Sequence, residues 1–263
     1  MSTVTTVPST DGTPIAYETL GAGDPVILVS AALCDRKTTA ALAEQLARHF
    51  TVLNYDRRGR GDSGDTTPYA VEREVEDIAA LIARAGGSAS VYGHSSGAGL
   101  ALHAAAHGLA IPKLVLHEPP FEPDDERVRR QSREDAEKIE GLLAEDRRCD
   151  ALELILSGTG MPPEMVRQMS TDPQVQAIAH TMLYDFAAMD DAGRGGRSFA
   201  RQAGEVRTPT LVLAGETSPE WMIEVGRQVA DAMPNGRHEI LKGQDHFVPA
   251  DVLAPVLTDF LTG

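Results

Sequence analysis

The chain has 263 residues, with 24 basic and 39 acidic side chains and a formal charge of −15. This length fits one large domain or two small ones, and it buries enough surface to fold without disulfides or a bound metal. Binding to phosphate groups needs clustered cations, so the acidic excess argues against nucleic acid or a membrane surface as partner. We therefore expect a small-molecule substrate, with a homodimer as an open alternative to a monomer.

The sequence also gives expectations about location. No apolar run reaches the roughly 18 residues that a membrane helix needs. The first residues show neither the basic segment nor the apolar segment of a signal peptide. Cys34 and Cys149 are too few for a disulfide framework and are expected to be reduced thiols. These features predict a cytoplasmic protein.

Short apolar segments alternate with helical stretches in the N-terminal half. Residues 3–8 and 14–20 flank a turn at Asp11-Gly12 and predict an antiparallel hairpin. Further strands are expected at 25–30, 51–56, 89–93 and 113–118, and helices at 37–49, 69–85 and 96–107. Strands separated by helices predict a mostly parallel sheet with helices on both faces.

The strand pattern breaks at Phe121 and returns at Thr208. Between them lies a stretch dense in charges of both signs, which indicates a solvated helix face, followed by further helical sequence. After the break the expected elements are strands at 210–215 and 238–243 and helices at 219–232 and 248–261. We predict a core domain of residues 1–120 and 205–263, with residues 121–204 inserted as a helical lid.

The segment Gly93-His94-Ser95-Ser96-Gly97 fits the pattern G-x-S-x-G. It follows a predicted buried strand and opens a helix, which is the context in which this motif marks a nucleophilic serine. A sharp strand-to-helix turn needs glycines where side chains would clash, and the start of the helix favours developing negative charge. Ser95 is therefore the candidate nucleophile.

A serine nucleophile needs a base, and His246 is the best candidate. It lies between the last predicted strand and the last helix, where loops at the carboxyl ends of parallel strands converge. His103 and His107 have the i, i+4 spacing of a metal pair but lack a third ligand. They are expected to be structural, so no metal site and no cofactor are predicted.

These motifs, together with the segments at 55–64, 114–121 and 208–215, resemble the α/β-hydrolase fold family. The likeness covers the chain apart from the lid. It implies an eight-stranded sheet, a triad of serine, acid and histidine, and a helical cap over the pocket. The glycine-rich run at 59–64 matches a dinucleotide-binding pattern, but its context predicts a turn capped by Asp62 or Ser63.

The sequence departs from the family's pattern after the third strand. The family usually has His-Gly there, and the next residue donates a backbone N–H to the oxyanion. Here the segment is Val-Ser-Ala-Ala-Leu at 29–33. Counting along it places Ala32 at the donor position, with the amide of Ser96 as the second donor. A backbone N–H does not depend on its side chain, so the oxyanion hole can persist.

The second departure concerns the acid. The family's usual acid position, after the seventh strand, holds Ser218. Glu118 ends the sixth strand and is the best substitute, a placement that resembles haloalkane dehalogenases, some of which keep their catalytic Glu there. Glu216 ranks second, a dyad without acid third, and Asp245 lower because it adjoins His246. A structural carboxylate is the competing interpretation of Glu118.

The sequence predicts a serine hydrolase acting on a small, fairly apolar ester, thioester or lactone. Met and aromatic side chains in the lid suit an adaptable pocket roof, and they equally suit plain packing. The predicted substrate-binding residues are Leu33, His94, Met182 and Tyr184. The alternative is a hydrolase fold reused for ligand binding or for a non-hydrolytic lyase or isomerase step.

Overall fold

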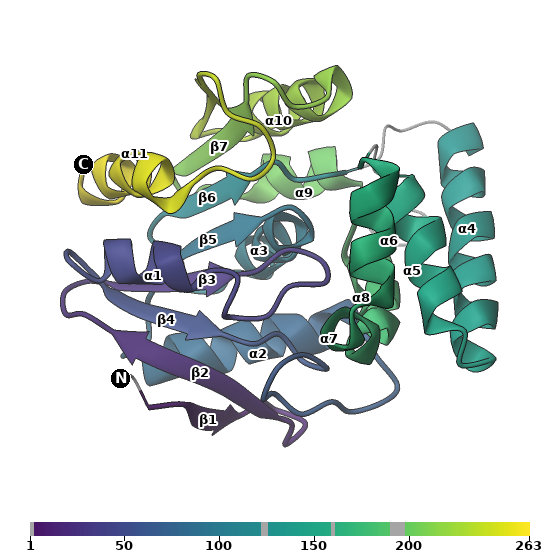
Figure 1. Cartoon of the computed structure of the whole chain (residues 1–263). Coiled ribbons are helices and arrows are strands. Elements are labelled where there is room, and N and C mark those ends of the chain that lie inside the picture. The colour runs from purple at the N-terminus through teal and green to yellow at the C-terminus, as the bar shows by residue number, and fades with distance from the viewer. Residues whose placement is uncertain (1–2, 122–125, 159–160, 190–197) are drawn as a thin grey trace.

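The computed structural model describes residues 3–121, 126–158, 161–189 and 198–263. Its centre is an eight-stranded sheet with the strand order β1-β2-β4-β3-β5-β6-β7-β8 (Figure 1). The strands are β1 (Thr5–Pro8), β2 (Pro14–Leu20), β3 (Pro25–Val29), β4 (Thr51–Tyr55), β5 (Ser90–His94), β6 (Leu114–His117), β7 (Thr210–Gly215) and β8 (Gly236–Leu241).

The sheet is mixed, because β2 runs antiparallel to both β1 and β4. From β4 to β8 all neighbouring strands are parallel. The predicted fold class, a mostly parallel eight-stranded sheet flanked by helices, is confirmed. Only β8 is clearly displaced from the expected range: it begins at Gly236 and ends before a turn at Gly243, whose φ is 69°.

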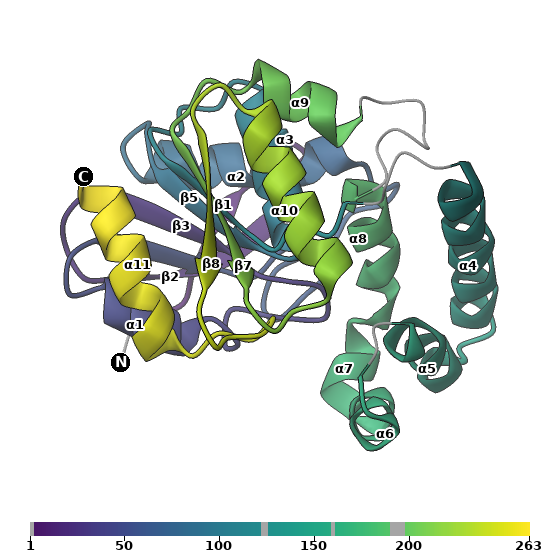
Figure 2. The same cartoon turned by 90° about the horizontal axis from the view of Figure 1, so that it is seen from above.

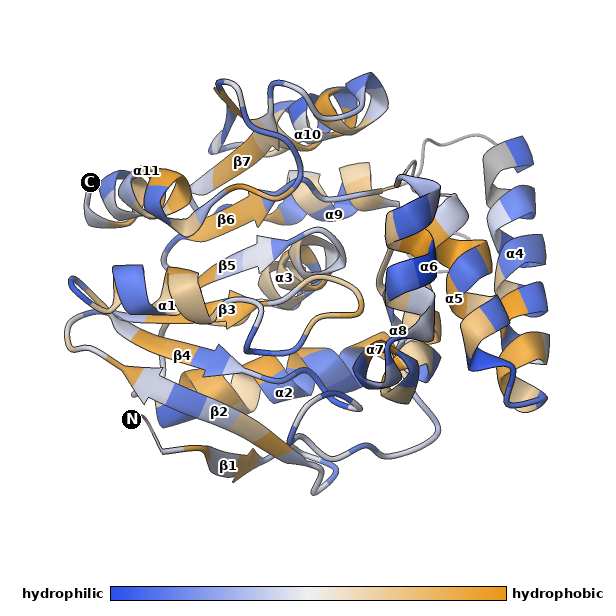
Figure 3. Cartoon of the chain, in the orientation of Figure 1, coloured by the Kyte–Doolittle hydropathy of each residue, from blue (hydrophilic) through white to orange (hydrophobic). Residues whose placement is uncertain are grey.

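Helices cover both faces of the sheet. α1 and α11 pack on one face, and α2, α3 and α10 pack on the other. Their bounds are α1 (Ala40–Leu46), α2 (Val71–Arg84), α3 (Ser96–Ala106), α10 (Glu220–Ala232) and α11 (Ala250–Thr262). The central strands are buried on both sides, which explains their unbroken apolar sequence (Figure 3).

The helical insertion is the chain between β6 and β7. Its helices are α4 (Glu126–Ala144), α5 (Arg148–Ser157), α6 (Pro163–Thr171), α7 (Pro173–Ala177), a 3₁₀ turn (Ala179–Thr181), α8 (Met182–Met189) and α9 (Phe199–Glu205). α4 to α7 lie away from the sheet, whereas α8 and α9 pack against α3 (Figure 2). The predicted lid range of 121–204 includes residues 122–125, 159–160 and 190–197, which lie outside the described part of the chain.

The parallel strands end on the side of the sheet that faces the helical insertion (Figure 1). In parallel-sheet proteins, loops at this edge converge and hold ligands. Among the described residues no helix is both long and apolar enough to cross a membrane. A functional site is therefore expected between the carboxyl ends of the strands and the insertion.

Candidate active site

Ser95 lies in the sharp turn between β5 and α3. Its φ of 54° and ψ of −123° are rarely adopted by a residue with a side chain. Cβ atoms at Gly93 and Gly97 would lie 2.3 and 2.5 Å from backbone oxygens, so both positions must lack a side chain. The tight turn places the serine at the start of α3, where the helix dipole favours negative charge.

His246 and Glu118 meet at the same edge of the sheet. Glu118 directly follows β6 with a φ of 49°, and His246 lies in the loop between β8 and α11. His246 Nδ1 forms a short hydrogen bond to Glu118 Oε2. An ionised carboxylate only accepts, so Nδ1 donates the proton, and a neutral ring with this tautomer has its lone pair on Nε2.

The carboxylate of Glu118 is fully buried and has two further donors. Its Oε1 accepts a hydrogen bond from Gly215 N at 2.6 Å and another from the Ser218 hydroxyl at 2.6 Å. Burial by itself raises the pKa of this carboxyl. The hydrogen bonds from His246, Ser218 and Gly215 outweigh burial and leave the pKa below its ordinary value.

The other candidate acids are engaged elsewhere. Glu216 is exposed and its Oε2 accepts from Gly243 N at 2.8 Å. Asp245 is exposed and accepts from Phe247 N at 2.9 Å. Within the described residues, Glu118 is the carboxylate that contacts the His246 ring.

The Ser95 hydroxyl and the His246 ring are not hydrogen-bonded to each other in the described part of the chain. Contacts between nucleophile and base are often long in a ligand-free site and shorten when substrate binds. The structure therefore brings His246 and Glu118 into contact, while the role of Ser95 as their nucleophile stays a prediction.

The two predicted oxyanion amides flank the site. Ala32 lies in the turn after β3, next to Leu33, whose φ is 55°. Ser96 is the first residue of α3. Across the described ranges neither backbone N–H has an acceptor within the protein. Both amides are thus free to bind a ligand oxygen, which keeps the predicted role open to test.

Three imidazole rings lie one against the next beside the site. The ring centroid of His94 is 4.7 Å from that of His117 and 4.6 Å from that of His246. His94 Nε2 donates to the backbone carbonyl of His246 at 3.0 Å. Burial, and then the neighbouring rings, lower the pKa of His94 well below its usual range. His94 is therefore a neutral support of the His246 loop, and its predicted contact with substrate stays untested.

The other predicted substrate-binding residues lie where the helical insertion meets the core. The ring of Tyr184 stacks on Tyr69 at 3.9 Å, and its hydroxyl donates to Asp65 at 2.8 Å. Met182 is buried at the start of α8. Leu33 packs against the apolar cluster inside the insertion. These contacts suit the packing interpretation of Tyr184, and binding of substrate by these residues stays a prediction.

The rings of both histidines on α3 make hydrogen bonds to backbone carbonyls. His103 is buried and donates from Nε2 to the Ala188 carbonyl at 2.9 Å, which ties α3 to α8. His107 donates to the His103 carbonyl at 2.8 Å. No cluster of three metal-ligating side chains occurs in the described ranges.

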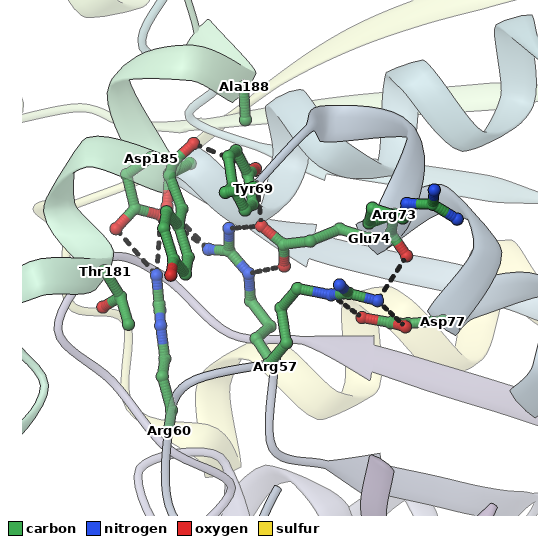
Figure 4. Close-up of polar contacts among 12 residues, drawn as sticks. Arg57, Arg60, Tyr69, Arg73, Glu74, Asp77, Thr181, Asp185 and Ala188 are labelled. Carbon is green, nitrogen blue, oxygen red and sulfur yellow. Dashed lines mark hydrogen bonds and ion pairs between the residues drawn. The ribbon is translucent and has the colours of Figure 1, made fainter. Parts of the chain in front are cut away.

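The arginines that follow β4 form a buried network that was not predicted from the sequence. Arg57, Arg58 and Arg60 are fully buried and are paired with carboxylates (Figure 4). Ser63, expected as a cap, instead accepts from Ala16 N and donates to the Asp56 carbonyl. The sequence signal that could have predicted this network is the presence of three arginines directly after a buried strand.

Comparisons with known proteins agree with the fold described above. A model of the alpha/beta hydrolase family matches residues 22–256. The chain is similar to the crystal structure of an alpha/beta hydrolase from Sphaerobacter thermophilus DSM 20745, with 48% identity, a TM-score of 0.87, and coverage of 98% of this chain and 100% of that one. An esterase from Exiguobacterium antarcticum shares the fold at 19% identity and a TM-score of 0.78, covering 98% and 99% of the two chains.

A curated relative, the uncharacterized hydrolase YraK of Bacillus subtilis (strain 168), is 33% identical over 113 residues. That match spans 41% of this chain and 42% of the relative, less than half the length of either. The family match, in contrast, runs from before β3 into α11 and includes the turn that carries Ser95. With this coverage, and with the sheet order and turn described above, the chain belongs to the alpha/beta hydrolase family.

Proposed function

We propose that this protein is a serine hydrolase that cleaves a small, fairly apolar carboxylic ester, thioester or lactone. The observation that carries the proposal is the hydrogen bond from His246 Nδ1 to the buried Glu118 carboxylate. It fixes the imidazole in the tautomer that a general base needs, at the sheet edge where Ser95 directly follows β5.

In the proposed mechanism Ser95 Oγ attacks the carbonyl carbon of the substrate. His246 Nε2 takes the serine proton and passes it to the leaving oxygen or sulfur. The same nitrogen then activates water, which attacks the acyl-enzyme and releases Ser95. Glu118 holds the Nδ1 proton throughout and stabilises the imidazolium that forms twice in each cycle.

The oxyanion of each tetrahedral intermediate would bind the amides of Ala32 and Ser96. Neither amide has an acceptor among the described residues, and the start of α3 adds a favourable dipole. The lining proposed for the acyl group is apolar. Leu33 and Met182 supply it, and Phe247, which is 59% exposed beside the His246 ring, offers an aromatic surface at the entrance.

A fluorophosphonate probe and a series of p-nitrophenyl esters of graded acyl length test this function. The wild type should be labelled and should hydrolyse short esters, whereas Ser95→Ala should do neither. Alanine keeps the Cβ of serine, so the strained turn is not changed further and the fold should persist. Circular dichroism and thermal unfolding check that it does.

Ser88→Ala is the matched control, because this exposed serine lies just before the opposite end of β5. It should be labelled like the wild type. Labelling or turnover in a folded Ser95→Ala would reject the nucleophile. A wild type that resists the probe and every ester would favour the ligand-binding or non-hydrolytic alternative.

A further inference from the structure

Asp185, on α8 of the helical insertion, is a fully buried carboxylate that binds two arginines of the core (Figure 4). Arg60 Nη2 donates to both of its oxygens, at 2.9 and 2.7 Å. Arg57 Nη1 donates to Oδ1 at 2.7 Å. One side chain of the insertion therefore holds two core side chains that are remote from it in the sequence.

The same two arginines also reach the two segments that carry the proposed oxyanion amides. Arg60 Nη1 donates to the Ala31 carbonyl at 2.6 Å, in the peptide group whose N–H belongs to Ala32. Arg57 Nη1 lies 3.2 Å from the Ser96 hydroxyl. Each arginine thus connects Asp185 to one of the two oxyanion donors.

The charges in this cluster balance. Arg57 also pairs with Glu74 through two hydrogen bonds of 2.7 Å, so two guanidinium groups meet two carboxylates. Burial raises the pKa of Asp185, but Arg60 and Arg57 lower it more, and the carboxylate is ionised at neutral pH. Removing its charge would leave one buried arginine uncompensated, and the pairing geometry would change.

The loop after β3 depends on such outside support. Leu33 has a φ of 55° without being a glycine, a backbone conformation that a residue with a side chain rarely adopts. Its other contact with the insertion is the packing of Leu33 against the apolar cluster of α5 and α6. A donor amide has to point at the oxyanion with little freedom to be effective in catalysis.

We propose that Asp185 is a positioning residue. Through Arg60 and Arg57 it couples the packing position of α8 on the core to the orientation of the Ala32 and Ser96 amides. This inference rests on the proposed hydrolase function for its catalytic part. Its structural part, the ordering of the two amide segments by a residue of the insertion, does not depend on any activity.

Asp185→Asn tests the inference, with Asp77→Asn as the matched control. Asp77 is equally buried and binds Arg58 through two hydrogen bonds, but this pair contacts neither oxyanion segment. Both variants should lower Tm. Asp185→Asn should lower kcat at least about tenfold with KM within about twofold, since loss of one oxyanion donor costs roughly 10²–10³-fold. Asp77→Asn should keep kcat within about twofold.

Hydrogen–deuterium exchange supplies a readout without activity. Amide exchange in residues 30–36 and 96–98 should speed up in Asp185→Asn and not in Asp77→Asn. Unchanged exchange in folded Asp185→Asn would overturn the inference, and so would equal changes in both variants. Faster exchange with unchanged kcat would overturn its catalytic part.

If Asp185→Asn does not fold, Arg60→Lys takes its place. Lysine keeps the charge opposite Asp185, but one ammonium group cannot hold that carboxylate and the Ala31 carbonyl as the guanidinium fork does. The same exchange and kcat changes are expected, and their absence would reject the inference. A wild type without probe labelling or ester turnover would instead reject the proposed function, while exchange would still decide the structural part.

Discussion

The ends of β6 and β7 are neighbours in the sheet, yet they hold different chemistry. β6 is followed directly by Glu118, whose carboxylate contacts the His246 ring. The loop after β7 carries Ser218, whose hydroxyl donates to Glu118. The end of one strand thus supplies the carboxylate, and the loop after its neighbour supplies a donor that supports it. The carboxylate partner of an imidazole is therefore defined by where its oxygen lies, and not by the strand that carries it.

The largest expected effect comes from removing the charge at the end of β6. Glu118→Gln should lower kcat for a short p-nitrophenyl ester by at least about a hundredfold. The amide keeps the shape but stabilises neither the imidazolium nor the correct tautomer, and in serine proteases an equivalent change costs about 10⁴-fold. Stopped assays at neutral pH, with a thermal melt as folding check, measure this loss.

Glu216→Gln is the control for this variant, because Glu216 lies after β7 but points to Gly243 N. It should change kcat by less than about twofold. A larger loss in Glu216→Gln than in Glu118→Gln would return the acid to β7. Full activity in both variants would mean either a dyad without an acid or another carboxylate in this role, such as Asp245.

A double variant places a carboxylate after β7 instead of after β6. Glu118→Gln combined with Ser218→Asp should regain about tenfold in kcat over Glu118→Gln alone. The Ser218 hydroxyl is 2.6 Å from Glu118 Oε1, so a carboxylate at position 218 starts close to the required place. One tenfold step corresponds to about 1.4 kcal/mol of transition-state stabilisation. No gain in a folded double variant would show that position 218 no longer points at the imidazole.

Ser218→Ala should lower activity less than loss of the Glu118 charge does. It removes one of the three donors to Glu118, so kcat should fall by less than about tenfold, and stability by about 1–2 kcal/mol. The depressed pKa of Glu118 gives stability that is present above its ordinary value of 4.5 and is lost as the pH falls. Losing a donor raises that pKa, so acid unfolding should begin at a higher pH.

Acid titrations followed by circular dichroism, on the wild type and Ser218→Ala, measure this shift. An unchanged acid midpoint would mean that the Ser218 hydroxyl does not hold the carboxylate. A hundredfold loss of kcat would instead give Ser218 a direct part in the reaction.

Most of the fold was predictable because strands and helices differ in their apolar periodicity. The buried strands β3, β6 and β7 read as continuous apolar runs, and the hairpin of β1 and β2 was marked by its turn. The start of β8 was displaced because its residues are mostly half-buried or exposed and carry charges. A strand at the edge of a sheet lacks the continuous apolar signal of a central one.

The site was predictable where the chemistry is local or set by topology. The turn around Ser95 follows from its glycines, and the contact of Glu118 with His246 follows from the convergence of strand ends. The partnership of Asp185 with Arg57 and Arg60 was not predictable, because the two arginines lie 128 and 125 positions away from it in the sequence. Nothing in the local sequence indicates which buried arginine a distant carboxylate will meet.

The stacked imidazoles link folding to the release of protons. Burial, together with the nearby His246 ring, lowers the pKa of His117 to about 3, and the pKa of His94 is also depressed. Below about pH 6.5 the unfolded chain binds protons at the His94 and His117 rings, whereas the native state does not. Each ring therefore removes about 1.4 kcal/mol of stability per pH unit over the interval between its two pKa values. In mild acid the unfolded chain must lose protons at these two rings in order to fold. Lowering the pH therefore destabilises the native state before the carboxylates begin to titrate.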